Sequence, residues 1–401
     1  MAALKDLIRN PNAAELDLAE RYTSFPADGR RERTFEAFAR SGLPHRRMEA
    51  WKWTDFKAAL PELSAAQVQS DPLENTDVPV LRLDGETLSG SDQLPSGIRY
   101  FEKTGGHALG GAEELPMGAV TAALAPKTHM FEVTEAVATP IRFVFSGNGT
   151  ASFNRVVFVI RPGASLSIIE SYVGGAGLNG VLLDFGVQKD ARLQRTFLQP
   201  ASPDQTWAVT AEVHLDGDAE YTQTALAFGG KLTRIETRVH HHETGSKATL
   251  NGAYLAADQH HIDFTSYVRH GAVACETVQR TKGAVMNGGT GVFQGKFYVP
   301  RIVGQRTSAD MQHNALLLEE GAVVNAKPEL EIYADDVECA HGNTCGALDA
   351  EALFYMRQRG IPEATARALL TEAFVSEALE TADESVADLI SQAARSWLQS
   401  V

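Results

Sequence analysis

The stretch IRFVFS at residues 141–146 opens a long region in which short extended runs follow one another without a helical pattern. Ile141, Phe143 and Phe145 project to the same side of an extended chain, because successive side chains of a strand alternate between its two faces. Further runs of this kind lie at residues 152–156, 193–198, 207–215, 219–227, 234–242, 248–255, 264–268, 292–299 and 316–318. Residues 136–337 are therefore predicted to consist almost entirely of strands.

About 200 residues of short strands suit a stacked β-solenoid, a closed barrel or a sandwich, although a sandwich usually needs only about 100 residues. No strict repeat is visible, so a solenoid has to be irregular. Frequent glycines favour a chain that turns often, namely Gly245, Gly252, Gly271, Gly283, Gly288, Gly289, Gly291 and Gly295. The pattern alone leaves these architectures open.

The region before the strands, residues 1–135, has a mixed pattern. Apolar residues recur at helical spacing in residues 13–24 and 32–41, and Gly42 ends the second of these helices. Short strands are expected later in this region, at residues 78–83 and 98–101. We therefore predict a mixed amino-terminal domain.

The region after the strands, residues 338–401, turns helical. One helix is expected at residues 350–359, where Gly360 ends it, and Pro362 is well tolerated at the first turn of the next. Apolar stripes at helical spacing continue to Leu398, so a compact helical cap is predicted. The predicted domains are thus 1–135, 136–337 and 338–401.

Composition and charge narrow the class of protein. The 401 residues are 44% hydrophobic and carry a formal net charge of -15, which repels nucleic-acid phosphates and anionic lipids. No apolar run approaches the roughly 20 residues that span a bilayer, and charged residues interrupt residues 1–10, so neither a membrane anchor nor a signal peptide is expected. Three cysteines cannot form a closed set of disulfides. We predict a cytoplasmic protein that binds neither nucleic acid nor membrane.

The densest group of candidate metal ligands consists of His240, His241, His242, His260, His261 and His270. On a strand, His240 and His242 project from the same face and can share a zinc, iron or copper ion, while His261 and Asp263 can add further ligands. This pattern supports an alternative function, a β-barrel metal-dependent enzyme centred on His240, His242 and His261. The competing interpretation places the histidines on the solvent face of half-buried strands, since no spacing completes a ligand set.

A second cluster lies in the sequence ECAHGNTC at residues 338–345 and contains Cys339, His341 and Cys345. Thiolates and an imidazole suit zinc or iron, but a closed structural zinc site needs four protein ligands. Two interpretations remain: a site that another chain completes, or a buried cysteine beside an ordinary surface histidine.

The usual catalytic signatures are absent from the sequence. It contains no G-x-x-x-x-G-K-[ST] phosphate loop, no G-x-S-x-G elbow and no H-E-x-x-H helix, and the glycines at 288–291 are expected to form a turn between strands. A β-helix enzyme that acts on acidic polysaccharide is disfavoured by the net charge of -15. No residue is therefore assigned a catalytic role.

The segment KPELEIYADDVECAHG at residues 327–342 closely resembles the hallmark of the SufB/SufD family of iron-sulfur cluster assembly scaffolds. The resemblance continues through ALFYMRQRGI at 352–361, which is similar to the family's transition into its carboxyl-terminal helical domain. Residues 42–54, with Arg47, Glu49 and Trp51, resemble the amino-terminal signature of the SufD branch, and residues 307–318 resemble late β-helix coils.

The resemblance implies a mainly β fold, with a right-handed parallel β-helix core between a mixed amino-terminal and a helical carboxyl-terminal domain. The SufD branch is favoured because residues 321–327 contain no cysteine and because Gly342 follows His341, where SufB carries a glutamate. The resemblance further implies a non-catalytic scaffold that pairs with SufB and whose helical cap binds the ATPase SufC.

Site residues follow from the same resemblance. His341 matches the histidine that supports the nascent cluster together with a SufB cysteine, and Cys339 beside it is a secondary candidate. Cys345 departs from the family pattern and is expected to be a packing thiol. No cofactor is expected to stay bound, only a transient iron-sulfur cluster shared with SufB, and unsealed β-helix edges make a homodimer of the isolated chain plausible. The candidate SufC contacts are Leu353, Phe354, Tyr355 and Arg359.

Overall fold

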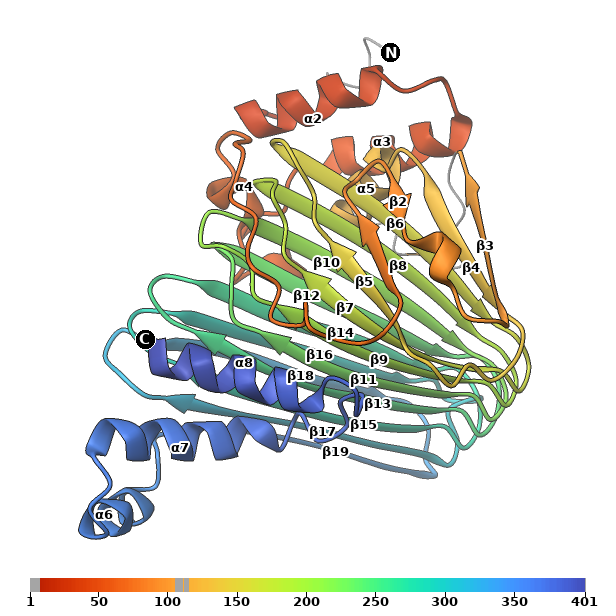
Figure 1. Cartoon of the computed structure of the whole chain (residues 1–401). Coiled ribbons are helices and arrows are strands. Elements are labelled where there is room, and N and C mark those ends of the chain that lie inside the picture. The colour runs from red at the N-terminus through yellow and green to blue at the C-terminus, as the bar shows by residue number, and fades with distance from the viewer. Residues whose placement is uncertain (1–7, 105–110, 112–114, 401) are drawn as a thin grey trace.

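The computed structural model describes residues 8–104, 111 and 115–400 and shows a long stack of strands with helices along its sides (Figure 1). Residues 1–7, on which the expectation of no signal peptide partly rests, lie outside the described range. Within that range, no helix combines the length and the apolar character that a membrane crossing requires.

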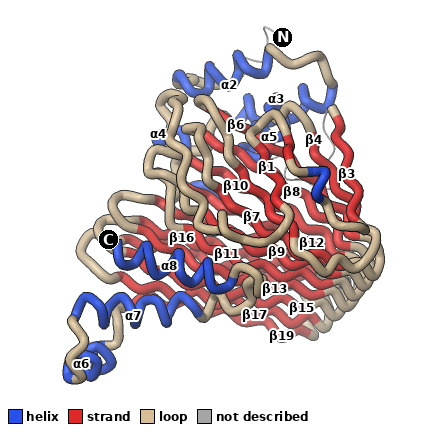
Figure 2. Tube along the Cα trace, in the orientation of Figure 1, coloured by secondary structure: helices blue, strands red, loops and turns tan. Residues whose placement is uncertain are grey.

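Two mostly parallel sheets form the core, and they supply the strands of each coil in turn (Figure 2). The ten-stranded sheet has the spatial order β19 (Val337–Gly346), β17 (Thr307–Leu317), β15 (Glu276–Val285), β13 (Lys247–Ala256), β11 (Glu220–Ala227), β9 (Arg192–Gln199), β7 (Ser165–Tyr172), β5 (Ile141–Phe145), β1 (Val80–Leu83) and β2 (Leu88–Ser89). The nine-stranded sheet has the order β18 (Val323–Ile332), β16 (Thr290–Val299), β14 (His261–His270), β12 (Leu232–His241), β10 (Thr206–Leu215), β8 (Leu178–Val187), β6 (Ala151–Ile160), β4 (Thr128–Val133) and β3 (Ile98–Lys103). Because the chain changes sheet after almost every strand, it winds as a parallel β-helix, which confirms the predicted fold and excludes the barrel and the sandwich.

Alternate side chains of each strand fill the interior of the β-helix. Phe131, Phe158 and Phe185 occupy matching positions in β4, β6 and β8 and stack with ring centroids 5.0 and 5.3 Å apart. Any apolar side chain of suitable size can continue such a column, so the coils need no strict sequence repeat.

The glycines of this region fall into two groups, although their spacing predicts turns for all of them. Gly245 and Gly288 do lie in turns, with φ of 80° and 73°. Gly283 and Gly291 instead lie inside β15 and β16, where a Cβ atom would come within 2.2 and 2.3 Å of the buried Tyr254 ring. These two glycines make room for an interior aromatic ring.

The helices predicted in the amino-terminal region are present. Asn12 and Glu15 form a capping box at the start of the first helix, and Gly42, with φ of 68°, follows the second. Both pack against the last helix of the region, which in turn packs against the outer face of the nine-stranded sheet near Phe153 and Leu178 (Figure 1). The helical elements are α2 (Ala13–Thr23), α3 (Gly29–Ser41), η1 (Glu49–Trp51), α4 (Phe56–Ala59), η2 (Ser91–Gln93) and α5 (Pro116–Leu124).

The carboxyl-terminal helices cover a side of the β-helix and do not cap its end. They are α6 (Ala350–Gln358), α7 (Glu363–Ser376) and α8 (Ala387–Ser400), and α8 lies along the outer face of the ten-stranded sheet (Figure 1). Val375 and Ile390 pack with the outward-facing Leu226 and Leu255 in one apolar cluster. The helices predicted after residue 350 are therefore present, and they bury their apolar stripes against the sheet.

The last strand of the β-helix extends beyond residue 338, where the sequence predicts that the helical domain begins. β19 pairs with β17 over residues 337–346, so Cys339 and His341 belong to the last strand of the β-helix and not to the helical region. This edge strand is half-buried or exposed along its length, and it lacks the apolar alternation by which a strand is recognised in a sequence.

Candidate functional site

The columns of inward-facing side chains in the β-helix end on its last strand, β19. Ala309, Met311 and His313 are buried on the inner face of β17, and they pair in register with Cys339, His341 and Asn343 of β19, respectively. Residues paired in register in a parallel sheet project to the same side. Since β19 and β18 are the terminal strands of their sheets, these three side chains lie at an open end of the β-helix.

Exposure differs among the candidate ligands at this end. His341 and Cys345 are exposed, whereas Cys339 is half-buried and packs against the interior apolar cluster. Burial raises the pKa of the Cys339 thiol, which therefore remains protonated at neutral pH until a metal ion or a basic group withdraws the proton. Cys345, which the sequence predicts to be a packing thiol, is exposed on β19, and no further strand lies beyond β19 among the described residues.

A hydrogen-bonded chain leads from the open end into the interior. Asn343 Oδ1 lies 2.6 Å from His313 Nδ1, and Tyr254 Oη lies 2.8 Å from His313 Nε2, while the Phe293 ring stacks on the imidazole at 4.5 Å. A neutral imidazole satisfies both contacts, with Nδ1–H donating to the Asn343 oxygen and Nε2 accepting from the tyrosine hydroxyl. Neither His313 nor Asn343 is predicted from the sequence, although the spacing of His341 and Asn343 along the strand places the asparagine beside the predicted site.

This buried imidazole should make stability depend on pH. Burial lowers the pKa of His313 to about 4, below its ordinary value near 6.5, so the neutral form is favoured in the folded chain. The unfolded chain takes up a proton first as the pH falls below about 6.5, and the stability should decline until the pH reaches about 4. At pH 5 this one group should cost roughly 2 kcal/mol.

Melting temperatures measured from pH 8 to pH 4 would check this expectation. The variant His313→Gln should show a shallower decline than the parent between pH 6.5 and pH 4, because glutamine does not titrate. An equal slope in parent and H313Q would contradict the assignment.

Cys339 and His341 are two potential metal ligands that lie close together on the end strand. They are two residues apart on the same face of β19, a separation of about 6.6 Å at the usual rise of a strand. One sulfur and one nitrogen are suitable iron ligands, and the remaining ligands of an iron centre would have to come from elsewhere. Across the residues that the structure describes, no group of three or more His, Cys, Asp or Glu side chains is arranged to hold a metal ion.

The residues expected to contact a partner ATPase lie on α6 and at its carboxyl end, and α6 projects away from the β-helix (Figure 1). Phe354 and Tyr355 are exposed by 62% and 59%, and Leu353 is half-buried. Arg359 places its guanidinium 5.1 Å from the centre of the Tyr355 ring. Because α6 has no buried residue, it presents two large aromatic side chains to solvent, as protein-binding surfaces often do.

The histidines proposed as a metal triad do not converge. His240 and His242 project together from the outer face at the end of β12, with ring centroids 6.1 Å apart, and the His214 ring stacks against both at 5.1 Å. His261 pairs with Leu232, eight residues before His240, which corresponds to roughly 26 Å along the strand. The triad prediction is therefore wrong, and the barrel that it required is absent as well.

Three other histidines of this group, His241, His261 and His270, have structural contacts. Thr54 Oγ1 lies 3.0 Å from His261 Nε2 and donates to the Asp263 carboxylate, which ties the amino-terminal segment to β14. His241 and His270 are buried inside the β-helix, where both rings reach the hydroxyl of Thr277 at 3.1 and 2.9 Å. The solvent-face interpretation thus holds for His240 and His242 but not for His241, His261 or His270.

Comparison with known proteins defines the class to which this fold and site belong. The family model of the SufBD core domain, described as SUF system FeS cluster assembly, matches residues 143–374. This match spans more than half of the chain, and the chain belongs to the SufBD family of iron-sulfur cluster assembly proteins.

Similar individual proteins include the iron-sulfur cluster assembly protein SufD of Escherichia coli strain K12. It is 26% identical over 397 residues, which cover 92% of this chain and 93% of that protein. Protein ABCI7, chloroplastic, of Arabidopsis thaliana is 27% identical over 396 residues, covering 89% and 83% of the two chains. A SufBD family protein of Synechocystis is 26% identical over 392 residues, covering 84% and 83%. The chain is therefore SufD-like, as its motifs predict.

Proposed function

We propose that this chain is a non-catalytic scaffold that pairs with a SufB-type subunit through the open end of its β-helix. The observation that carries the proposal is the exposed end strand, on which Cys339 and His341 continue the interior columns without a further strand beyond them in the described chain. Edge strands such as β18 and β19 have backbone N–H and C=O groups available to a partner strand. Two copies of this chain can use the same edges when the SufB-type partner is absent.

The cluster is the cargo of this shared interface. His341 and Cys339 contribute a nitrogen and a sulfur, and thiols of the SufB-type subunit complete the iron coordination, so this chain keeps no permanent cofactor. A SufC-type ATPase binds α6, and its ATP-driven closure distorts the scaffold pair and opens the interface. The assembly works in the cytoplasm, where thiols remain reduced.

Co-expression with both partners tests the proposal. The chain should co-purify with a SufB-type and a SufC-type subunit in a stable complex, and the complex should acquire the visible absorption of an iron-sulfur cluster when iron and sulfide are supplied. A chain that elutes alone at every salt concentration would rule the proposal out.

The ATPase contact can be tested on its own. The double variant Phe354→Ala with Tyr355→Ala should retain less than about a tenth of the SufC-type subunit, because truncating an aromatic anchor of an interface typically costs about 2 kcal/mol or more. Pull-down of both partners measures the effect, and pairing with the SufB-type subunit should persist. Ile302→Ala removes a side chain that is 84% exposed at a turn of the β-helix and should change neither contact. Full SufC retention by the double variant would place the contact elsewhere.

A further inference from the structure

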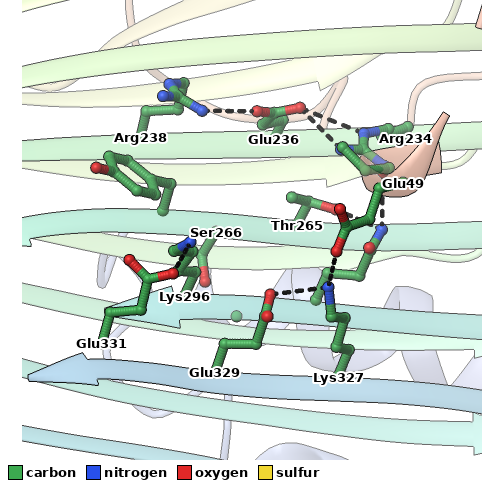
Figure 3. A pocket seen from close by; sticks show the side chains of 14 residues that line it. Glu49, Arg234, Glu236, Arg238, Thr265, Ser266, Lys296, Lys327, Glu329 and Glu331 are labelled. Atoms are coloured by element: carbon green, nitrogen blue, oxygen red, sulfur yellow. Dashed lines mark hydrogen bonds and ion pairs between the residues drawn. The ribbon is translucent and has the colours of Figure 1, made fainter. Parts of the chain in front are cut away.

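A pocket of about 430 Å³ lies on the outer face of the nine-stranded sheet, apart from the inward-facing residues of β19 (Figure 3). Its floor is formed by β12, β14, β16 and β18, and η1 supplies a wall through Glu49 and Ala50. This wall belongs to the amino-terminal motif at residues 42–54, to which the proposed function assigns no role.

The wall is held firmly against the floor. Arg234 Nη1 donates to the Ala50 carbonyl oxygen at 3.0 Å, and the same guanidinium stacks over the buried Trp51 ring at 3.9 Å. Gln294 Nε2 donates to the same carbonyl at 3.3 Å. The pocket is therefore formed before any ligand arrives, which lowers the entropic cost of binding.

The lining contains equal numbers of positive and negative side chains. The cations are Arg234, Arg238, Lys296 and Lys327, and the carboxylates are Glu49, Glu236, Glu329 and Glu331. A purely anionic or purely cationic ligand would meet as many repulsive charges as attractive ones, and an apolar ligand would strip water from charged groups without replacing it. A ligand that carries both charges avoids both penalties.

Charged side chains at the pocket form ion pairs with one another that a ligand could replace (Figure 3). Lys296 Nζ lies 2.6 Å from Glu331, and Lys327 Nζ lies 3.1 Å from Glu329 and 3.4 Å from Glu49. All five side chains are at least 31% exposed, and exposed ion pairs are typically worth no more than about 1 kcal/mol. A ligand can therefore replace these pairs with its own at little cost.

We propose that this pocket binds a short peptide with free termini. The carboxylate of the peptide contacts Lys296 and Lys327, its ammonium group contacts the neighbouring Glu329 or Glu331, and Tyr267 packs against a side chain of the ligand. A cavity of this volume is large enough for a small ligand such as a peptide of two or three residues. Binding at this site does not depend on the SufB-type or SufC-type partner.

Titration calorimetry of the full chain with the tripeptide glycyl-tyrosyl-glycine tests the proposal. The uncapped peptide should bind with a Kd of about 1 mM or tighter. Acetylation of its amino terminus or amidation of its carboxyl terminus should weaken binding at least tenfold. These comparisons use the parent protein, so they stand even if a variant fails to fold.

Paired substitutions locate the site. Lys296→Met with Glu331→Gln removes one ion pair of the pocket and should weaken binding at least tenfold. Lys247→Met with Glu276→Gln removes a similar exposed pair, 3.1 Å long, between β13 and β15 of the other sheet and should leave the affinity unchanged. The proposal would be overturned if the parent protein showed no binding at 10 mM peptide or bound the capped and uncapped peptides equally well. It would also be overturned if both double variants lost the same amount of affinity. Partner co-purification is measured separately, so either proposal can fail alone.

Discussion

Replacing His341 with alanine is expected to lower cluster assembly in the complete complex by roughly 10- to 100-fold, the range typical for disturbing a metal site. The side chain is exposed on the end strand, so its removal should leave the fold and the binding of the SufC-type subunit intact. Iron and sulfide content per complex, followed by visible absorption, measures the effect. Circular dichroism and the melting temperature report on the fold.

Glu338→Ala is a matched control for this experiment. Glu338 lies on the same strand but pairs with the exposed Ser308, so it projects to the outer side of the β-helix. Its replacement should leave cluster assembly within about twofold of the parent. If H341A unfolds the chain, the histidine is structural, and if it assembles normal amounts of cluster, the imidazole is not a ligand.

Replacing Arg195 with methionine is expected to cost about 3–5 kcal/mol of stability. Arg195 lies inside the β-helix on β9, fully buried, and forms two 2.8 Å hydrogen bonds with the equally buried Glu170 of β7. Its other partners are the Tyr172 hydroxyl at 3.0 Å and Gln223 Oε1 at 3.0 Å. The substitution leaves the Glu170 carboxylate buried without its cation, and urea unfolding followed by tryptophan fluorescence measures the loss.

The comparison variant is Arg192→Met on the same strand. Arg192 pairs with Glu220 at 3.1 Å, but the two side chains are 71% and 44% exposed, so the loss should stay below about 1 kcal/mol. Removing both buried charges, with Arg195→Met and Glu170→Gln together, should recover part of the stability lost in R195M. Equal unfolding midpoints for R195M and R192M would show that the buried pair contributes nothing.

Strands with clear alternation were predictable from the sequence. Residues 207–215, 219–227 and 248–255 closely match β10, β11 and β13, because their apolar and polar side chains alternate or form a continuous buried run. β8 is not predictable in this way, since it is buried on both faces and Gly180 and Gly186 interrupt its apolar residues, so it shows no alternation. The end strand β19 is not predictable either, because it is polar and half-buried or exposed along its length.

Some residues of the candidate site can likewise be predicted from the sequence, and others cannot. Cys339 and His341 were identified because they lie in a local motif, two residues apart. His313 and Asn343, which continue the site into the interior, are 30 residues apart in the chain and meet only through the register of β17 and β19. The supposed metal triad failed for the same cause, since spacing along a chain does not say which positions of neighbouring strands are paired.

By itself, the sequence determined the strand-rich core, the flanking helices, the family and the ligand types near residue 340, because periodicity and motifs are properties of neighbouring residues. Only the tertiary structure decided that α8 lies along a sheet and leaves the end of the β-helix open, and that η1 walls a charged pocket on β18. These arrangements depend on contacts between distant segments, such as the one between Glu49 and Lys327, 278 residues apart. Such contacts follow from packing and strand register, and no local pattern records them.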